Sequence, residues 1–479
     1  MNRTIIFALL FCLGSSVSFS KVSMHYKLDK DNASSNGPAG NGISDMVAGK
    51  NCLWFGSGNG LSRYNFITNE FETFENVPGL VNDPISAIYA KGDTVFVSAA
   101  IDTFVQALDD IVDWGKGFSF SFDNGRTWSY IPQPGVTPGQ NVTWDFTILD
   151  GVIWGASFGG GLLKSADWGA TWESTTPDTL VYDPNHNLNH LPFSVLNADG
   201  ILWVGTSGGL NKSMDNGETW THFTFSNQPE HISGNWVVNL AHQKTAERDI
   251  IWACTWKAAG KNEYYAVSKT ENGGRSWDVV LEGERAYNFA FDGANVYVAT
   301  WTNGLFKSPD YGKTWYNFAP IKQEKTGERV YTKEYYSVHT ENGRVWVGTQ
   351  DGLARTTNNG YTWDLFRAFQ PTGQSGEPRT YAYPNPFSPK RDNLLNNEGH
   401  VRLQYNTKED TYVTIKIYDY AMDLVTTVCE NQFRPGPGDY NNVWDGRNDY
   451  GDEAANGVYF YSVEIDGDGT YWGKIMIVN

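Results

Sequence analysis

The sequence predicts an all-β protein, built from tandem copies of one four-stranded unit and ending in a smaller all-β module. The first observation is a short phrase whose closing tryptophans lie 44, 48, 57, 38 and 48 residues apart, which is typical of repeat architectures. The second is composition: 50 glycines and 15% aromatic residues in 479 favour short strands and many turns. The third is alternation of apolar and polar residues near the C-terminus, as in half-buried antiparallel strands.

The phrase, here called the box, reads S-x-D-x-G-x-T-W. Strict copies are residues 121–128, 165–172, 213–220 and 308–315, and looser copies are 270–277 and 356–363. We expect the aspartate to accept backbone N–H groups two residues further on, the glycine to adopt positive φ and the tryptophan to cover the hairpin. The predicted role is structural for Asp123, Asp167, Asp215, Asp310, Trp128, Trp172, Trp220, Trp277, Trp315 and Trp363.

A larger unit of roughly 47 residues contains each box. It has an inner apolar strand, a second strand of the pattern apolar-Trp-apolar-Gly, a glycine-rich turn and a Gly-Leu pair before the box. Four short strands fit this length, so we expect four-stranded sheets that close in a ring. Seven second strands are found, beginning at Leu53, Val95, Val152, Leu202, Ile251, Val296 and Val345.

The box resembles the Asp-box, or BNR repeat, of sialidases, sortilin-type receptors and many secreted propellers. Residues 53–64 resemble the two-component-regulator propeller repeat, which belongs to the same kind of blade. The resemblance implies a seven-bladed β-propeller over residues 42–370. It also implies that the boxes join the third and fourth strands of each blade, on the face opposite the usual ligand site.

The segment 380–479 carries a second resemblance. The phrases at residues 383–387 (Y-P-N-P-F), 417–419 (I-Y-D), 444–447 (W-D-G-R) and 456–460 (N-G-V-Y-F) resemble a FlgD-like Ig domain. The ending 474–478 also resembles type IX secretion sorting domains. Both imply a small Ig-like β-sandwich that handles export or attachment and not catalysis. Residues 371–379 break all periodicity and are predicted to be a linker.

Residues 1–20 are predicted to be a secretory signal. Arg3 is followed by an apolar run over residues 5–13 and by small residues up to 20. The apolar run is too short to span a bilayer, and no other segment is long and apolar enough to cross. Residues 21–41 form a polar lead-in that could add one outer strand to the ring. We therefore expect a secreted or outer-surface protein.

Charge and cysteine content narrow the partners and the sources of stability. Subtracting 36 basic from 54 acidic residues gives −18, which disfavours nucleic acid and anionic membranes. The three cysteines beyond the signal, Cys52, Cys254 and Cys429, form no disulfide framework. The expected partners are a polysaccharide or protein ligand at one propeller face, and secretion machinery at the C-terminal module.

The ligand face is expected where the connections are long, because insertions on one face mark the binding face of a repeat protein. Within residues 99–116, apolar residues recur at helical spacing and predict a short amphipathic helix. The other long connections are 131–143, 174–191, 223–234 and 318–333.

Aromatic residues at the starts of inner strands and the ends of second strands are the favoured binding residues. We expect them to be exposed on the ligand face, because aromatic faces beside Asp and Asn suit glycans or peptides. The alternative is that they fill the space between blades. With their polar neighbours they are Trp144, Asp145, Trp236, Trp256, Tyr287, Asn288, Trp301, Tyr335 and Tyr336.

Sialidase chemistry is the main catalytic alternative. It needs three arginines around a carboxylate, a tyrosine nucleophile with a glutamate partner and an acidic group near the leaving oxygen. The early Arg-Ile-Pro phrase of that family is missing, and Arg126 and Arg275 lie inside boxes. We predict no catalytic residue; an extracellular glycosidase and a scaffold of a secretion or motility apparatus remain as alternatives. The groups that could be assembled are Arg285, Arg329, Tyr287 with Glu284, and Tyr335 with Glu334.

No metal site or cofactor is predicted. Asp183, His186 and His190, with His231 in the next loop, could ligate a metal if they lay on a helix, but Pro184 favours an irregular loop. The oxygen-rich turns at 445–452 and 466–469 lack the full ligand series of an EF-hand and favour hairpin turns. A phosphate-binding glycine loop, a Ser-His-Asp elbow and a Cys-x-x-Cys pair are also missing from the sequence.

Overall fold

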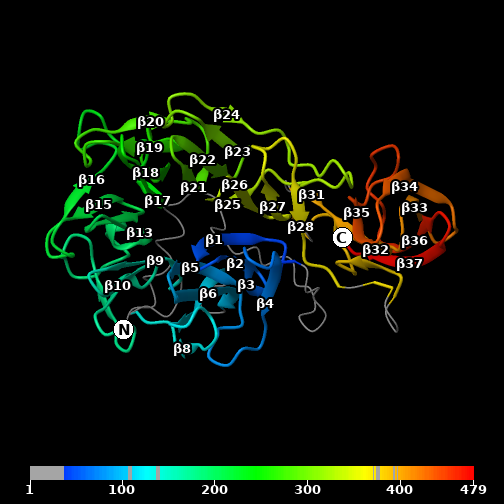
Figure 1. The fold of residues 1–479 in the computed structure, drawn as a ribbon, viewed down its shortest axis with the longest axis horizontal. Helices are drawn as coiled ribbons and strands as arrows, with labels where there is room; N and C mark the ends of the chain where they lie inside the picture. Colours follow the sequence, from blue (N-terminus) through cyan, green and yellow to red (C-terminus); the bar gives the residue numbers. More distant parts are fainter. Residues whose placement is uncertain are drawn as a thin grey trace.

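The computed structural model describes residues 37–105, 110–135, 141–370, 372–373, 378–391, 394–395 and 398–479. These residues are arranged almost entirely as strands and turns (Figure 1), with a single 3₁₀ turn at Leu188–His190 among them. In the described part of the chain, no helix has the length and apolar character needed to cross a membrane. The all-β prediction is confirmed. The predicted signal, 1–20, and most of the lead-in lie outside the described residues.

The described residues between 43 and 366 form seven four-stranded antiparallel sheets in chain order. Their strands are β1 (Ile43–Gly49), β2 (Cys52–Ser57), β3 (Gly60–Asn65) and β4 (Glu70–Phe74); β5 (Ile85–Lys91), β6 (Thr94–Val105), β7 (Asp110–Ser121) and β8 (Ser129–Ile131); β9 (Thr143–Leu149), β10 (Val152–Ser157), β11 (Gly161–Ser165) and β12 (Glu173–Thr175); β13 (Pro192–Ala198), β14 (Ile201–Thr206), β15 (Gly209–Ser213) and β16 (Thr221–Phe223); β17 (Trp236–Lys244), β18 (Asp249–Trp256), β19 (Ala266–Thr270) and β20 (Asp278–Val280); β21 (Ala286–Asp292), β22 (Asn295–Thr300), β23 (Gly304–Ser308) and β24 (Tyr316–Asn317); and β25 (Tyr335–Glu341), β26 (Arg344–Thr349), β27 (Gly352–Thr356) and β28 (Asp364–Phe366).

The sheets form a closed ring. The first strand of each sheet contacts the first strand of the next, and β25 of the last sheet contacts β1, so the first strands surround the axis and the fourth strands lie at the rim (Figure 1). Asn41 joins the two ends: its Nδ2 donates to Ala368 O at 3.2 Å, and its Oδ1 accepts from Ala368 N at 2.8 Å. The first sheet is complete without the lead-in, so the described residues before β1 add no outer strand.

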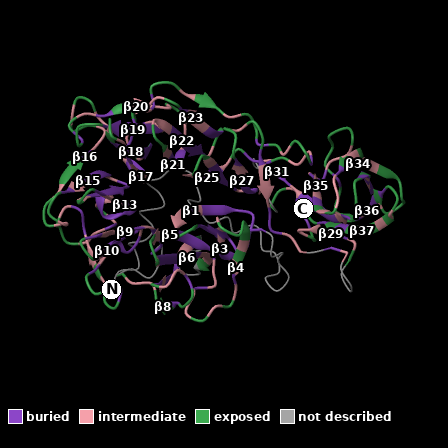
Figure 2. Cartoon of the chain, in the orientation of Figure 1, coloured by how far each residue is buried: buried purple, intermediate pink, exposed green. Residues whose placement is uncertain are grey.

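Neighbouring sheets are joined by a repeated aromatic sandwich. In the third sheet, Trp154 on β10 is fully buried and lies directly opposite Lys164, whose Nζ is 5.3 Å from the indole centroid. The box glycine of the fourth sheet, Gly217, lies against the six-membered ring of the same indole. A Cβ on Gly217 would lie 2.7 Å from Cη2 of Trp154. Figure 2 shows the resulting buried inner strands and exposed rim. The same sandwich recurs at Trp54 with Arg63 and Gly125, and at Trp252 with Lys269 and Gly312.

The box turns have the predicted chemistry with a different register. Asp123 Oδ1 accepts from the N–H groups of Arg126 at 3.0 Å and Thr127 at 2.9 Å. These donors lie three and four residues after the aspartate, whereas the prediction placed the donor two residues after it. The hydroxyl and N–H of Thr127 lower the pKa of Asp123 to about 2. Trp128 Nε1 donates to Gly125 O at 3.1 Å, so the indole folds back over its own turn.

The helix predicted within residues 99–116 is wrong. Strands β6 and β7 continue as a long hairpin in which Ile101 pairs with Trp114 and Phe104 with Ile111; residues 106–109 lie outside the described part. β-branched and aromatic residues favour strands, and a short apolar run fits either period. The pairing of β6 with β7 therefore makes these residues a hairpin and not a helix.

The C-terminal module consists of two facing antiparallel sheets and one short hairpin. Val401, Leu403 and Tyr405 of one sheet and Val413, Ile415 and Ile417 of the other are fully buried in one core, which confirms the predicted alternation. The strand order is β29-β32-β35 in one sheet and β34-β33-β36-β37 in the other. The strands are β29 (Thr380–Tyr383), β30 (Leu394–Leu395), β31 (Glu398–Gly399), β32 (Val401–Thr407), β33 (Thr411–Tyr418), β34 (Leu424–Arg434), β35 (Gly438–Trp444), β36 (Gly457–Ile465) and β37 (Gly469–Ile477).

Buried ion pairs dock the module on the last sheet of the ring. Asp351, in the turn between β26 and β27, pairs with Arg402 of β32 and, at 3.1 Å, with Arg367. Arg434 donates to Thr326 O across the same interface. Asp351, Arg402 and Arg434 are all buried, and Figure 1 shows the module lying beside β27 and β28.

We expect Gly217→Ala to destabilise the ring by more than a glycine substitution elsewhere. Gly217 and Gly200 have nearly the same φ, +90° and +87°, but a Cβ on Gly200 meets nothing within 4 Å. Both substitutions should cost about 1–2 kcal/mol of backbone strain, and Gly217→Ala a further 1–3 kcal/mol for displacing Trp154. Denaturant unfolding measures both. Equal losses for the two variants would contradict the sandwich.

Asp351→Asn should loosen the docked module. The substitution leaves Arg367 and Arg402 buried with reduced compensation, which costs about 3–5 kcal/mol. Unfolding curves and limited proteolysis of the segment between the two parts measure the effect. The control is Asp93→Asn, which removes an exposed pair with Lys50 and should change stability by less than about 1 kcal/mol. Similar behaviour of the two variants would rule out a stabilising interface.

Candidate functional site

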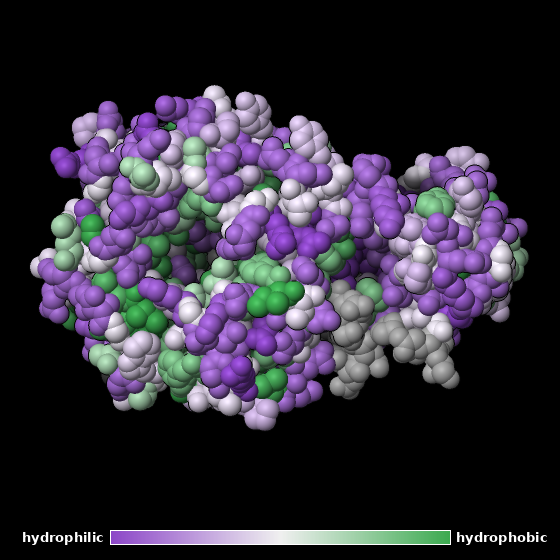
Figure 3. Space-filling view, viewed as in Figure 1, coloured by the Kyte–Doolittle hydropathy of each residue, from purple (hydrophilic) through white to green (hydrophobic). Residues whose placement is uncertain are grey.

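The antiparallel order of each sheet assigns its turns to two faces. The turns between second and third strands lie at the same end as the connections from each fourth strand to the next sheet, and the box turns lie at the opposite end. The first of these ends is here called the connection face. It carries the β6–β7 hairpin and the long connections 174–191 and 318–333. The space-filling view is hollowed near the middle of the ring (Figure 3).

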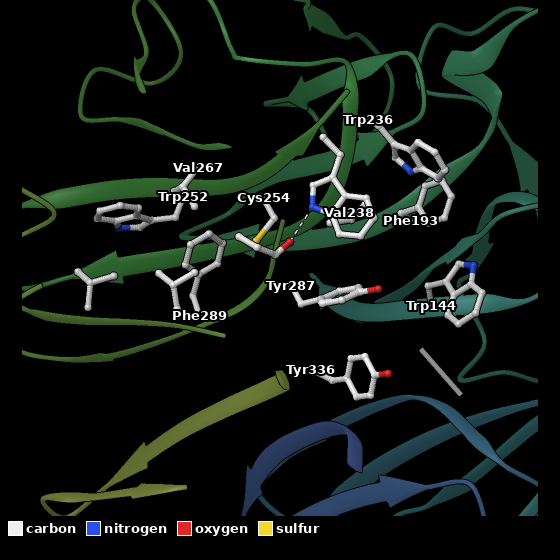
Figure 4. Close-up of a cluster of buried hydrophobic side chains, with 14 of the residues drawn as sticks. Trp144, Phe193, Trp236, Val238, Trp252, Cys254, Val267, Tyr287, Phe289 and Tyr336 are labelled. Atoms are coloured by element: carbon white, nitrogen blue, oxygen red, sulfur yellow. Dashed lines mark hydrogen bonds between the residues drawn. The ribbon is translucent and has the colours of Figure 1, made fainter. Parts of the chain in front are cut away.

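A β-bulge lies near the start of each inner strand, and in five consecutive sheets it carries an apolar or aromatic side chain. The register shifts in every first strand of the ring, and bulges commonly re-aim a side chain. Figure 4 shows Trp144, Tyr287 and Tyr336 converging from β9, β21 and β25. Over five consecutive sheets, the bulged residues are Trp144, Phe193, Val238, Tyr287 and Tyr336. In the first two sheets they are Ser44 and Ser86, whose hydroxyls donate to the next inner strand.

Several of these rings belong to one continuous aromatic cluster. Ring centroids are 5.3 Å apart for Phe193 and Trp236, 6.2 Å for Trp236 and Trp256, and 5.1 Å for Trp256 and Tyr287. Tyr287 continues the contact to Tyr336 at 5.5 Å. The cluster therefore spans four adjacent sheets on the axis side.

Exposure of these aromatic residues was predicted and is wrong for most of them. The exposed fractions of Trp144, Trp236, Trp256, Tyr287, Tyr335 and Tyr336 are between 2% and 6%. Tyr335 packs with Ile321 and Val330 between the last two sheets. Trp301 alone of the predicted aromatic residues is half-buried, and Arg285 stacks over it at 5.3 Å. Large aromatic side chains that gather near the axis of the ring bury one another. The position of a residue at the start of a strand therefore does not predict whether its side chain is exposed.

Asp145 and Asn288 connect sheets. Asp145 Oδ2 accepts from Val195 N at 3.0 Å, and Asn288 Oδ1 accepts from Val338 N at 3.1 Å. Asp45 makes the same contact with Ile88 N at 2.9 Å. The polar residue after each of these bulges therefore joins one inner strand to the next.

The tyrosine–glutamate pair that forms is a different one from those predicted. Tyr336 donates its hydroxyl to Glu334 Oε2 at 2.8 Å, whereas Glu284 accepts from Thr302 and Asn303. Burial, and secondly the charge of Glu334, raise the pKa of Tyr287 and of Tyr336. Both phenols are therefore neutral at physiological pH, and Tyr336 donates its proton in the hydrogen bond to Glu334.

The described arginines do not gather at the axis. Arg285 stacks over Tyr265 at 4.5 Å, and Arg329 over Tyr331 at 4.7 Å. Where arginines do approach each other, they meet at the interface with the module, as Arg367 and Arg402 do on Asp351. An arginine grip for an anionic sugar is not assembled within the described residues.

The histidines considered as metal ligands make other hydrogen bonds. His190 is buried; its Nδ1 accepts from Asp183 N at 2.8 Å, and its Nε2 lies 2.9 Å from Asp178 Oδ1. His186 pairs with Asp183 in the solvent. The described residues hold one other group of metal-ligand type, Asp199, His242 and Asp249. Its members come from two sheets, so spacing in the sequence gave no signal; Asp199 is paired with Lys244, and His242 with Asp249.

A carboxyl pair on the β6–β7 hairpin was also missed. Asp102 and Asp113 lie directly opposite one another. Burial, the hydrogen bond to Asp102 and the charge of Asp102, in that order, raise the pKa of Asp113 to about 8. The pair therefore holds one proton at neutral pH. Cross-strand pairing creates it, and the sequence suggested a helix there.

The chain matches no family model and no curated protein. Among solved structures it is similar to the GH74 enzyme of Niastella koreensis, at 13% identity and a TM-score of 0.53, over 92% of this chain and 73% of that one. It is also similar to YCF48 from Cyanidioschyzon merolae (16%, TM-score 0.46, 70% and 98%). A third is PorZ, a surface component of the type IX secretion system of Porphyromonas gingivalis (13%, TM-score 0.40, 91% and 66%). These structures are β-propellers, and the GH74 likeness shows that fold here.

Asp113 should make the hairpin lose stability as the pH rises from about 4 to about 8. Because its folded pKa of about 8 lies above the ordinary carboxyl value of 3.8, its contribution is complete below about pH 4 and is lost as the pH rises through 8. Asp113→Asn should therefore match the parent at pH 4 and exceed it by on the order of 1 kcal/mol or more at pH 9. Thermal unfolding from pH 4 to 9 measures this, with the exposed Asp150→Asn as control. A constant difference between Asp113→Asn and the parent would contradict the raised pKa.

Proposed function

We propose that the protein is an exported β-propeller that binds a ligand at its connection face. In this proposal residues 42–370 form a seven-bladed propeller of Asp-box type. Residues 380–479 form an Ig-like, FlgD-like module for export or attachment, and residues 1–20 are a secretory signal. The observation that carries the binding role is the set of bulges by which five consecutive sheets direct apolar or aromatic side chains toward the axis, at the end of the ring where the long connections lie.

Binding is favoured over glycoside hydrolysis by the geometry of the acidic groups. A glycosidase holds its two carboxyl groups about 5–5.5 Å or 6.5–9.5 Å apart, depending on mechanism. Asp102 and Asp113 share a hydrogen bond, so they are too close for either arrangement. Tyr336 is a neutral donor to Glu334, and the arginine group that sialidase chemistry needs is not assembled among the described residues.

A polysaccharide is the favoured ligand class. Trp301 is half-buried and lies under the guanidinium of Arg285, and an aromatic ring beside polar groups suits sugar rings. The net charge of −18 opposes polyanions. A protein ligand is the other outcome that the following experiment distinguishes.

Trp301→Ala should weaken ligand binding by about 1–2 kcal/mol, or roughly tenfold in Kd, because aromatic anchors dominate such interfaces. A glycan array, with a peptide array in parallel, identifies the ligand, and calorimetry measures the variants. The matched control is Trp168→Ala, since Trp168 is 48% exposed in a box turn on the opposite face. Equal weakening by both variants, or none by either, would contradict a ligand at Trp301.

A panel of chromogenic glycosides tests the catalytic alternative with the same preparations. The binding role predicts no turnover by the parent protein. Turnover that disappears in Tyr336→Phe or Glu334→Gln would instead establish a glycosidase.

A further inference from the structure

A cluster of titratable side chains lies between the fourth and fifth sheets, on the face opposite the connection face. The four strands of each sheet alternate in direction, so the turn between the first and second strands lies at the same end as the box turn. β17 of the fifth sheet packs against β13 and β14 of the fourth. The β13–β14 turn and the β17–β18 turn therefore lie next to each other at this end of the ring (Figure 1).

The cluster brings one imidazole and two carboxylates together from two different sheets. Asp199 lies in the β13–β14 turn, His242 lies on β17, and Asp249 begins β18. One ligand atom from each side chain lies within 4.8 Å of the other two. Two ligands about 2.1 Å from an ion at a tetrahedral angle are roughly 3.4 Å apart. Rotation of the two exposed aspartate side chains is therefore enough to close the three atoms around one ion.

His242 is held in place by the packing of β17. Leu240, two residues earlier on the same face of the strand, is buried in one cluster with Ala198 of the fourth sheet. The same face therefore directs His242 toward the β13–β14 turn, and its side chain is only 14% exposed. Nε2 of His242 lies 2.8 Å from Oδ1 of Asp249. The imidazole and one carboxylate are thus already side by side.

A cationic group of the protein already lies at this cluster. The ammonium of Lys244 pairs with Asp199. The hydrogen bond to Asp199 and its charge, and then the charge of Asp249, raise the pKa of Lys244. One ammonium balances one of the two carboxylates, whereas a divalent ion would balance both. Lys244 is exposed on a flexible stem, so its ammonium can move aside when such an ion binds.

We propose that Asp199, His242 and Asp249 bind a divalent transition-metal ion of the zinc type, which joins the fourth sheet to the fifth. An imidazole ligand suits zinc and its neighbours in the first transition row, whereas calcium and magnesium take oxygen ligands. Three protein ligands leave at least one coordination position for water. The site lies on the face opposite the proposed ligand site, so this inference is independent of the proposed function.

The test is calorimetric titration of zinc chloride into the full chain after treatment with a chelator, with calcium chloride as the comparison. His242→Gln and Asp199→Asn should each weaken zinc binding about tenfold or more. Asparagine is chosen because it tolerates the left-handed φ of 51° at Asp199. Lys244→Gln should tighten binding roughly two- to fivefold, because it removes an exposed ion pair that competes for Asp199. The matched control is His186→Gln, since His186 pairs with Asp183 in the solvent and is in no three-ligand group of the described residues.

Thermal unfolding gives a second readout, because an ion that binds only the folded chain stabilises it. Excess zinc should raise the Tm of the parent protein and of His186→Gln, but not the Tm of Asp199→Asn.

One zinc ion per chain, lost in His242→Gln and Asp199→Asn and bound more tightly by Lys244→Gln, supports the proposal. Calcium binding as tight as zinc binding, with no effect of His242→Gln, overturns the class of metal. Zinc binding that is unchanged in His242→Gln and Asp199→Asn, or no zinc binding by the parent protein, overturns the site.

Discussion

The contact between a box glycine and an aromatic ring of the preceding sheet is the interaction that packs most neighbouring sheets of the ring together. Trp154 lies between Lys164 of its own sheet and Gly217 of the next, and Trp54 and Trp252 are held in the same way. A cation over an aromatic face gains energy, and the missing Cβ allows the next turn to approach the ring edge. At two other joints the box glycine approaches a phenylalanine instead, Gly274 at Phe223 and Gly360 at Phe318. The phrase therefore provides both the turn and a close approach to an aromatic ring of the preceding sheet.

The box turns lie at one end of the sheets, so the turns and connections at the opposite end can differ between sheets. The box turns stabilise one face, while the bulges and long connections shape the opposite one. Asp45, Asp145 and Asn288 each bond the inner strand of the following sheet, so the strands around the axis are fixed before any ligand arrives. Such a rigid support suits groups carried on turns.

Residue patterns predicted the fold better than the site. The apolar-Trp-apolar-Gly strands and the boxes were sufficient for seven four-stranded sheets, because each pattern has a local physical cause. The hairpin at 99–116 was misread since Ile101 and Phe104 fit both periods, and only pairing with β7 decides. The burial of Trp144 and Tyr287 depends on how closely the neighbouring aromatic side chains pack, and a single sequence does not contain this information.

Every sheet of the ring is made from four consecutive strands, with none contributed by a distant segment. Pairings of this kind are local in sequence, and local contacts form quickly. Each sheet can therefore form from one continuous stretch of chain, independently of the residues that follow it. Two events must wait for the last residues: the joining of Asn41 to Ala368 and the arrival of Arg402 at Asp351. The final module therefore docks on a ring whose sheets are already complete.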